Sequence, residues 1–280
     1  MTDSTTPATD ADVAATTTTT NPAGPAPASL AGKTVLVTGA SRGVGRAAAL
    51  FLAERGATVV INYRSKARRA EQVAEEVEAK GGKAFIVEAD VTDFASVDAM
   101  YGKVKDAVGG LDVLILNASG GLEKDAAPDY AMVLNRDAQV NLVRAALPVL
   151  NPGARIVFVT SHLAHFHGEK PVMPEYEPVA ASKKAGENAL RDMIPDLTDR
   201  GFSLVVVSGD LIDGTITPKL LQRSRPGIIE ARRQEAGGWL PTTEDFATAI
   251  VDAAGDVDLA TGDIVYVGST EWADDSPTAG

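Results

Sequence analysis

The sequence predicts an α/β protein in which helices cover both faces of one parallel sheet. Seven short apolar runs alternate with segments of helical length from residue 33 onward. The first six runs are continuously apolar, as strands are when helices bury both of their faces. The chain of 280 residues can bury one large core, and its composition does not shift after residue 30. We therefore expect a doubly wound, parallel seven-stranded sheet in a single domain.

The predicted strands cover residues 34–38, 57–62, 84–90, 111–117, 154–161, 203–209 and 263–268. The segments between them have helical patterns. After the second strand, for example, Ala70, Val73, Ala74 and Val77 form one apolar stripe, and the glycines at 81 and 82 end the helix.

The two ends of the chain and one long internal segment have a different character. Residues 1–29 are rich in Thr, Ala and Pro, which predicts a disordered tail before a domain over 30–270 and a flexible C-terminus over 271–280. The longest stretch without a strand follows residue 210. We expect it to form a substrate lid at about 210–240, whose Leu, Ile and Trp239 side chains could cover an apolar substrate. Packing of the lid on the body of the domain explains these side chains equally well.

Charge and composition exclude several classes of partner. The net charge of −12, with scattered basic residues, disfavours nucleic acid. No apolar run is long enough for a membrane span, and no basic-then-apolar secretory signal begins the sequence. The absence of cysteine excludes disulfides and thiolate chemistry and fits a reducing compartment. These features predict a soluble cytoplasmic protein.

The first predicted strand runs into the glycine-rich stretch “TGASRGVG” at residues 38–45, which a helix follows. Glycines at 39, 43 and 45 allow a tight turn and a close approach of a pyrophosphate, which binds the free N–H groups at the start of the helix. A glycine pattern by itself is weak, but its position between a strand and a helix indicates a dinucleotide site.

Two further stretches occur in order after this one, “ADVTD” at 89–93 and “LNAS” at 116–119. Together the three resemble the motifs of the short-chain dehydrogenase/reductase family over about residues 31–270, although Leu116 and Ser119 replace an asparagine and a glycine. The resemblance implies a Rossmann-like fold that binds a nicotinamide cofactor. It places at the cofactor Gly39, Ser41, Arg42, Gly43, Val44, Gly45, Arg64, Asp90, Val91, Asn117, Ala118 and Lys183. In this family Asp90 would bond the adenine amine and Val91 would pack on its ring.

The end of the second strand predicts which cofactor binds. NAD enzymes usually place an acid there for the ribose hydroxyls, whereas this stretch reads “INYRSK”. Arg64 and Arg42 suit a 2′-phosphate, which arginine binds bidentately. We expect NADP(H) to be preferred over NAD(H); the alternative is that Arg64 only solvates the start of a helix.

The family resemblance also implies a reaction centre. Its members use a tyrosine as acid/base, a lysine that lowers the tyrosine pKa, a serine that holds the substrate oxygen and an asparagine that anchors a proton relay. Ser161, Lys183 and Asn135 stand at three of these positions. The fold usually forms dimers or tetramers through the helices that here carry Asn135 and Lys183.

The tyrosine is displaced. Val179 stands four residues before Lys183, where the family has its tyrosine, and the loop after Ser161 is about five residues longer than usual. Tyr176 lies three residues earlier, just before a helix that we expect to begin near 177 because Pro178 and nearby glutamates favour a helix start. From there its side chain could fold back toward Lys183 and Ser161.

The long loop also holds the three histidines of the chain, His162, His165 and His167. We expect no metal, because no cysteine is available and the nearby carboxylates are not at a ligand spacing. His162 is the alternative proton donor, since an imidazole titrates near neutral pH. His165 and His167 are expected to line or cap the pocket.

These patterns predict an NADPH-dependent carbonyl reductase that acts on a small or medium organic molecule, with Tyr176 favoured over His162 as its acid. The alternative is a catalytically silent NADP(H)-binding sensor or scaffold protein, since valine at 179 cannot transfer a proton.

Overall fold

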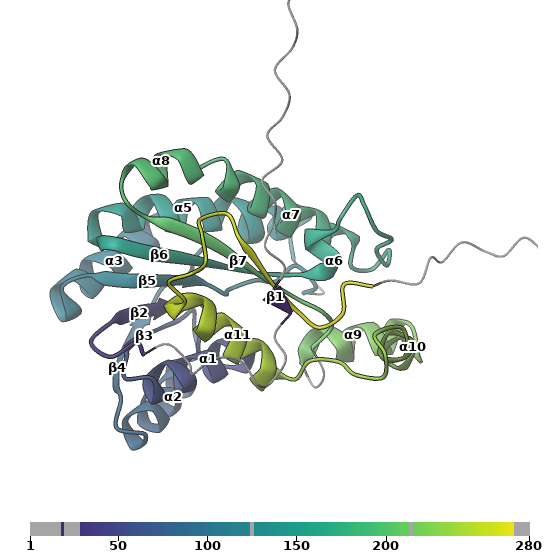
Figure 1. The fold of residues 1–280 in the computed structure, drawn as a ribbon, viewed down its shortest axis with the longest axis horizontal. Coiled ribbons are helices and arrows are strands. Elements are labelled where there is room, and N and C mark those ends of the chain that lie inside the picture. Colours follow the sequence, from purple (N-terminus) through teal and green to yellow (C-terminus); the bar gives the residue numbers. More distant parts are fainter. Residues whose placement is uncertain (1–17, 20–28, 124–125, 213–214, 272–280) are drawn as a thin grey trace, which may run out of the picture.

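Eight parallel strands form one sheet in the order β1-β8-β7-β6-β5-β2-β3-β4 (Figure 1). The computed structural model describes residues 18–19, 29–123, 126–212 and 215–271. The strands are β1 (Thr18–Thr19), β2 (Thr34–Val37), β3 (Thr58–Tyr63), β4 (Lys83–Glu88), β5 (Leu111–Leu116), β6 (Leu150–Ser161), β7 (Ser203–Gly209) and β8 (Ile264–Val267). The seven predicted strands, from β2 to β8, are confirmed.

The additional strand, β1, lies in the segment that was predicted to be disordered. Thr18 and Thr19 pair in parallel with Val265 and Tyr266 of β8, at the edge of the sheet. At these two residues the structure differs from the prediction, because the open edge of β8 offers backbone groups that an extended tail can bond. The other predictions for 1–29 and 271–280 lie almost entirely outside the described residues.

Helices cover both faces of the sheet (Figure 1). One face carries α1 (Gly43–Glu54), α2 (Ala67–Ala79) and α11 (Thr243–Gly255), and the other carries α3 (Phe94–Val108), α5 (Ala138–Ala146), α7 (Glu177–Arg191) and α8 (Ile194–Asp199). Successive strand residues point to opposite faces, so that Val35 packs in the first layer and Leu36 in the second. Continuous apolar strands are needed for this arrangement, as the sequence predicted.

The helix after β3 follows its predicted pattern. Ala70, Val73 and Val77 of α2 are buried, and Ala67 and Ala74 pack against the same core, while most of the remaining positions are exposed. The helix ends at Ala79, two residues before the glycine at 81, whose φ is +79°.

Several short elements surround the carboxyl end of the sheet. They are α4 (Tyr130–Met132), the π-helix η1 (Val133–Asp137), the 3-10 helix η2 (Leu147–Val149), α6 (His162–His165), α9 (Ile216–Ser224) and α10 (Ile228–Glu235). A third apolar cluster connects some of them, with Tyr176, Val179, Leu211 and Leu221 buried in it. The lid predicted at about 210–240 thus corresponds to α9 and α10.

The strand order reverses between β2 and β5. From β2 the chain proceeds outward to β3 and β4, and then returns to place β5 on the other side of β2. In doubly wound sheets ligands bind at the carboxyl ends of the strands at such a point. The topology therefore locates the candidate site before any side chain is considered.

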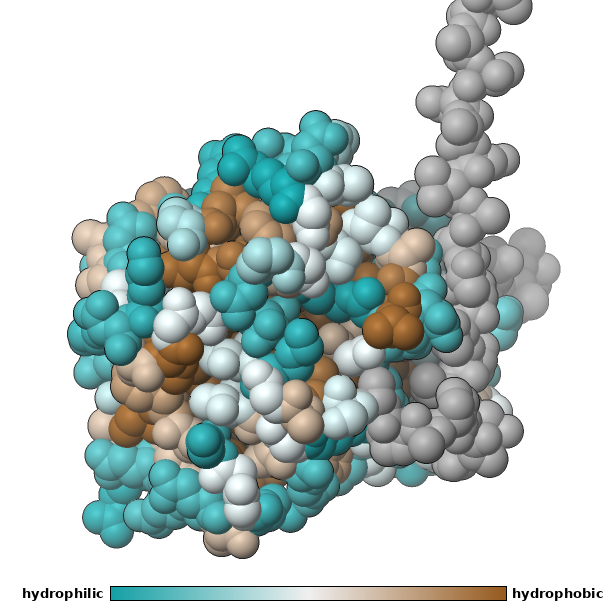
Figure 2. Space-filling model, turned by 60° about the vertical axis from the view of Figure 1, so that its left-hand side comes forward, coloured by the Kyte–Doolittle hydropathy of each residue, from teal (hydrophilic) through white to brown (hydrophobic). Residues whose placement is uncertain are grey.

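The face of the molecule in Figure 2 shows hydrophobic residues in separate groups among hydrophilic ones. Among the described residues, the exposed large apolar side chains are Phe94, Trp239 and Val257. No helix within the described part of the chain has the length and apolar character that crossing a bilayer requires.

Gly186 provides a test of the packing between α7 and η1. A Cβ atom at this position would lie 2.0 Å from the carbonyl oxygen of Asn135, whereas one at Gly102 on α3 would meet nothing within 4 Å. Gly186→Ala should therefore lower the free energy of unfolding by about 2 kcal/mol or more, through overpacking. The matched Gly102→Ala should raise it by about 0.5 to 1 kcal/mol, through helix propensity. Urea denaturation measures both, and equal effects at the two sites would contradict the close approach.

Candidate active site

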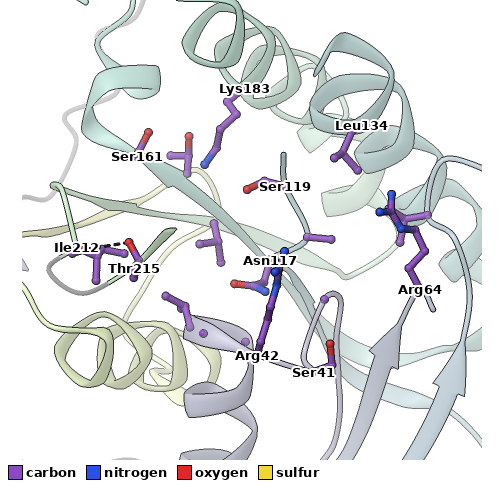
Figure 3. A pocket seen from close by; sticks show the side chains of 18 of the residues that line it. Ser41, Arg42, Arg64, Asn117, Ser119, Leu134, Ser161, Lys183, Ile212 and Thr215 are labelled. Atoms are coloured by element: carbon purple, nitrogen blue, oxygen red, sulfur yellow. Dashed lines mark hydrogen bonds between the residues drawn. The ribbon is translucent and has the colours of Figure 1, made fainter. Parts of the chain in front are cut away.

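One cavity of about 710 Å³ opens at the carboxyl ends of the strands, across the point where the strand order reverses. Figure 3 shows Ser161 and Lys183 at one end of it and Arg64 at the other, with Arg42 and Asn117 between them. The amine of Lys183 points into the cavity. The structure thus brings the predicted cofactor and catalytic residues to one site, with the exceptions of Asn135 and His162.

The glycine turn between β2 and α1 forms one wall. Gly39 and Gly43 have φ values of +66° and +55°, which side chains rarely adopt. A Cβ atom on Gly45 would lie 2.6 Å from Nδ2 of Asn117 and 2.7 Å from the carbonyl oxygen of Gly39. Each predicted glycine is therefore required by the backbone, and the turn leads into the amino end of α1, where N–H groups can bind a pyrophosphate.

The hydroxyl of Thr38 joins β2 to the segment after β5. Its Oγ1 accepts hydrogen bonds from the backbone N–H groups of Asn117, at 2.9 Å, and Ala118, at 3.0 Å, and donates to the carbonyl of Ile115. Asn117 in return donates from Nδ2 to the carbonyl of Thr38, at 2.9 Å. Asn117 therefore supports the scaffold beneath the cavity.

Asn62 at the end of β3 continues this support, and the sequence reasoning missed it. Its Oδ1 accepts from the N–H of Gly39 at 3.2 Å, and its Nδ2 donates to the carbonyl of Ala89 at 3.3 Å. The amide thus holds three neighbouring strand ends together. A polar residue at the end of an otherwise apolar strand was the available signal.

Four basic side chains line the part of the cavity, from its middle to the Arg64 end, that was predicted to bind a phosphate. Arg42 and Arg64 were expected there, and Lys66 and Arg69 join them. Nη1 of Arg64 donates to the hydroxyl of Tyr130 on α4, at 2.9 Å, which orients the guanidinium. The basic run directly after β3 could have identified the two additional cations.

Asp90 and Val91 follow β4 and line the same end of the cavity. Oδ1 of Asp90 accepts from both the backbone N–H and the hydroxyl of Thr92, at 3.0 and 2.7 Å. These bonds fix the carboxylate in its turn. The positions of Ser41, Val44 and Ala118 in the cavity wall also agree with the predicted cofactor site.

Tyr176 lies beside Ser161, at the end of the cavity opposite the cations. The two hydroxyl oxygens are 3.3 Å apart, and both residues line the cavity together with Lys183. Helix α7 begins at Glu177, so Tyr176 precedes its first turn, as the sequence predicted. Val179, at the position where the family has a tyrosine, is instead buried in the third apolar cluster.

Burial changes the acidity of two groups at this end. It raises the pKa of Tyr176, which the hydrogen bond to Ser161 partly offsets. It also lowers the pKa of Lys183 to about 8, against the attraction of Glu187, which raises it. A phenol that keeps its proton at neutral pH is a competent donor in a reduction.

Asn135 lies behind the cavity wall. Its Nδ2 donates to the carbonyl of Gly120, at 2.9 Å, and to Oγ of Ser182, at 3.0 Å, while its Oδ1 accepts from the N–H of Gly120. The side chain is buried and does not line the main cavity. Its amide therefore positions the neighbours of Lys183 and does not contact a ligand in the cavity.

His162 is not placed to donate a proton. The residue is 1% exposed and does not line the cavity, and its Nδ1 lies 2.8 Å from Oγ of Ser208. Burial and, to a smaller extent, the positive charge of Arg232 lower the pKa of His162 to about 3. The short helix α6, which the sequence reasoning did not predict, turns this side chain inward, so the geometry does not support His162 as the acid.

The other two histidines do not line the cavity either. Nδ1 of His165 lies 2.9 Å from both carboxylate oxygens of the buried Glu187, and its Nε2 lies 3.0 Å from the hydroxyl of Tyr266. His167 pairs with Glu177. Among the residues that the structure describes, no three His, Asp or Glu side chains gather as a metal site requires.

Apolar side chains surround the Tyr176 end of the cavity. Leu163 after β6, Leu211 and Ile212 after β7, and Pro218 on α9 contribute to the wall. Trp239 does not line it and is 49% exposed, so the described structure gives no support to a role of Trp239 in covering the substrate. The side chains that approach from the lid come from α9 and from the segment before it.

The fold and the cavity define a dinucleotide-binding α/β protein with a Tyr, Ser and Lys group at one end of its site. Comparison with known proteins identifies the class further, because the family model described as short chain dehydrogenase matches residues 33–224. The chain belongs to the short-chain dehydrogenase family. This membership places it among oxidoreductases that act on CH–OH and C=O groups.

Relatives of known function agree. The chain is 35% identical over 184 residues to a 1-cyclohexenylcarbonyl-CoA reductase of Streptomyces collinus, an alignment that covers 64% of each chain. It is 34% identical over 193 residues to the trihydroxynaphthalene reductase of Colletotrichum orbiculare, with 67% of each covered. Among solved structures, the angucycline C-6 ketoreductase LanV with bound NADP superimposes with a TM-score of 0.70 at 30% identity, over 85% of this chain and 95% of that one.

The buried Lys183 should reduce stability at neutral pH. Its folded-state pKa of about 8 lies below the ordinary 10.5, so the cost of burying the charge is complete below pH 8 and is relieved as the pH rises toward 10.5. Lys183→Met should therefore raise the free energy of unfolding at pH 7 by about 1 to 3 kcal/mol. The difference in the free energy of unfolding between the variant and the wild type should be smaller at pH 9 to 10.

Denaturant unfolding across this pH range measures the effect. Lys103→Met, on the exposed side of α3, is the control and should leave the pH dependence as in the wild type. A Lys183→Met protein with the stability profile of the wild type would contradict the lowered pKa.

Proposed function

We propose that the protein is an NADPH-dependent carbonyl reductase in which Tyr176 is the proton donor. The observation that carries the proposal is the 3.3 Å approach of the Tyr176 and Ser161 hydroxyls in the cavity that Lys183 also lines. This approach supports a role for Tyr176 in place of the family tyrosine, although Tyr176 lies outside the helix. The catalytically silent alternative depended on Val179, and Tyr176 removes its main support.

Each residue has a defined task in this proposal. The nicotinamide supplies hydride to the carbonyl carbon when it is bound. Ser161 donates a hydrogen bond to the substrate oxygen, and Tyr176 transfers its proton to that oxygen as charge develops there. Lys183, in its protonated form, lowers the cost of the transient phenolate, and the apolar wall keeps water away.

The wall also suggests the class of substrate. Leu163, Leu211, Ile212 and Pro218 make the Tyr176 end apolar, and the lining contains no basic side chain near them other than Lys183. Such a wall favours an uncharged cyclic ketone over an anionic one. Two of the relatives are named for aromatic polycyclic substrates, a hydroxynaphthalene and an angucycline. We infer that the substrate is a ketone or quinone of this kind.

The four cations at the opposite end favour NADP(H). The chain directly after β3 supplies Arg64, Lys66 and Arg69 and no acidic side chain for the ribose hydroxyls of the cofactor. Arg42 lies in the glycine turn. A 2′-phosphate could bond both guanidinium groups there. The glycine turn suits a pyrophosphate as well, since Gly45 allows an approach of the backbone to Asn117 and Gly39 that a side chain would prevent.

Two further properties remain proposals. Association into a dimer or tetramer would use the helices that carry Asn135 and Lys183, and light scattering on the purified protein measures it. A cytoplasmic location would suit a cysteine-free enzyme that depends on NADPH.

Tyr176→Phe tests the proton donor. NADPH consumption is followed with a panel of cyclic ketones and quinones, and the variant should lose two to four orders of magnitude in kcat, roughly the effect of a missing general acid. Its NADPH affinity should be unchanged. Tyr266→Phe removes a hydroxyl outside the cavity and should be nearly as active as the wild type.

Full turnover by Tyr176→Phe would refute this assignment. A wild-type protein that binds NADPH tightly and reduces no compound of the panel would favour the silent sensor or scaffold instead.

Replacing both Arg42 and Arg64 by alanine tests the cofactor. NADPH should lose about 1.5 to 3 kcal/mol of affinity for each charged bond removed, whereas NADH should change little. Arg46→Ala, on the exposed side of α1 and outside the cavity, is the matched control. Titration of cofactor fluorescence measures all six affinities, those of the wild type, the double variant and the control for each cofactor. An equal loss for the two cofactors would contradict the NADP(H) preference.

A further inference from the structure

Helix α10 is anchored by a charged residue. Arg232 is the only buried residue of this helix, whose eight residues are all described. Ile228 and Ile229 are only partly buried, where they pack against the third apolar cluster. A short helix with so little apolar contact needs another interaction to keep its place.

Arg232 provides that interaction through its whole guanidinium. Its Nε and Nη2 donate to the two carboxylate oxygens of Asp210, at 2.9 and 2.8 Å. Its Nη groups also donate to the backbone carbonyls of Ser269, at 2.8 Å, and Glu271, at 2.6 Å. One side chain therefore connects α10, the end of β7 and the segment after β8.

Asp210 connects this contact to the site. It is 5% exposed, directly follows β7 and lines the cavity, and its Oδ1 also accepts from the N–H of Leu211. Leu211 itself is part of the wall near Tyr176. Asp210 thus lies in the cavity wall next to Leu211, while Arg232 binds its carboxylate.

Helix α10, which Arg232 anchors, supports α9, the other helix of the lid. Helix α10 packs against α9, whose Pro218 lines the cavity and whose Leu221 is buried beside Tyr176 and Val179. A bidentate ion pair is directional, so it sets the rotation of α10 as well as its distance from the sheet. Loss of the pair would also leave the Asp210 carboxylate unmatched beside the substrate.

We propose that Arg232 is a positioning residue whose ion pair with Asp210 holds α10 and α9 as the wall of the substrate end of the cavity. Its effect on the affinity for a carbonyl compound rests on the proposed function. The effect of Arg232 on the order of α9 and α10 does not depend on the proposed function. The cofactor end lies on the other side of the cavity and should be insensitive to Arg232.

Two substitutions and a control separate these effects. Arg232→Met keeps the length of the side chain and removes the charge, and Arg232→Lys keeps the charge but cannot bond both carboxylate oxygens and both carbonyls. Arg223→Met, at an exposed position on α9, removes an equal charge from the same lid. Amide hydrogen exchange over 216–235 and over β5 and β6 is measured for each, with the KM and kcat for a reduced ketone and the Kd of NADPH.

Arg232→Met should accelerate exchange over 228–235 about tenfold or more while β5 and β6 stay protected. KM for the ketone should rise about tenfold, with kcat and the NADPH Kd changed by no more than about threefold. Arg232→Lys should give intermediate values, and Arg223→Met should match the wild type.

Unchanged exchange in 228–235 would overturn the proposal, whether or not the protein reduces a ketone. Faster exchange throughout the sheet would also overturn it, since Arg232 would then support the fold as a whole. If the lid loosens as expected but the wild type reduces no ketone, the positioning role stands and the proposed function fails.

Discussion

The hydroxyl of Thr38 holds together the two strands between which the order of the sheet reverses. It accepts from the backbone of Asn117 and Ala118, and this bond keeps the end of β5 against the glycine turn after β2. The close approach leaves no room for a side chain at Gly45. The cavity opens where the carboxyl ends of β2 and β5 meet. Its cofactor end extends to one side of this point and its substrate end to the other.

Tyr176 lies close to Ser161 although it precedes the helix in which the family motif has its tyrosine. A tyrosine in the first turn of α7 would be tied to Lys183 by the helical spacing. Tyr176 precedes the helix, so its direction depends on the longer loop, on α6 and on the apolar cluster that buries Val179. The hydroxyl still reaches Ser161. Because Tyr176 lies outside the helix, the position of its hydroxyl depends on packing that the rest of the family motif does not specify.

Buried charge pairs surround this end of the cavity. Glu187, four residues after Lys183, is bound by His165 and Arg191, and Asp210 is bound by Arg232. Each carboxylate is matched, so the interior beside the site is polar but nearly neutral, which suits an uncharged substrate. The pair of His165 with Glu187 connects α6 to α7, and the pair of Arg232 with Asp210 connects α10 to the end of β7. The orientation of α10 and the pKa of Lys183 therefore depend on contacts between separate elements of the fold.

The sequence by itself determined the strands, the glycine turn, the cations after β3 and the start of α7, because each depends on local periodicity, backbone freedom or capping. It did not determine the tail strand β1, the inward turn of His162 or the roles of Asn62, Tyr130 and Arg232. These depend on contacts between segments far apart in the chain, such as Asp210 with Arg232 or Arg64 with Tyr130. The choice between Tyr176 and His162 was of the same kind. Both lie near Ser161 in the sequence, and only the packing of α6 and α7 decided which side chain faces the cavity.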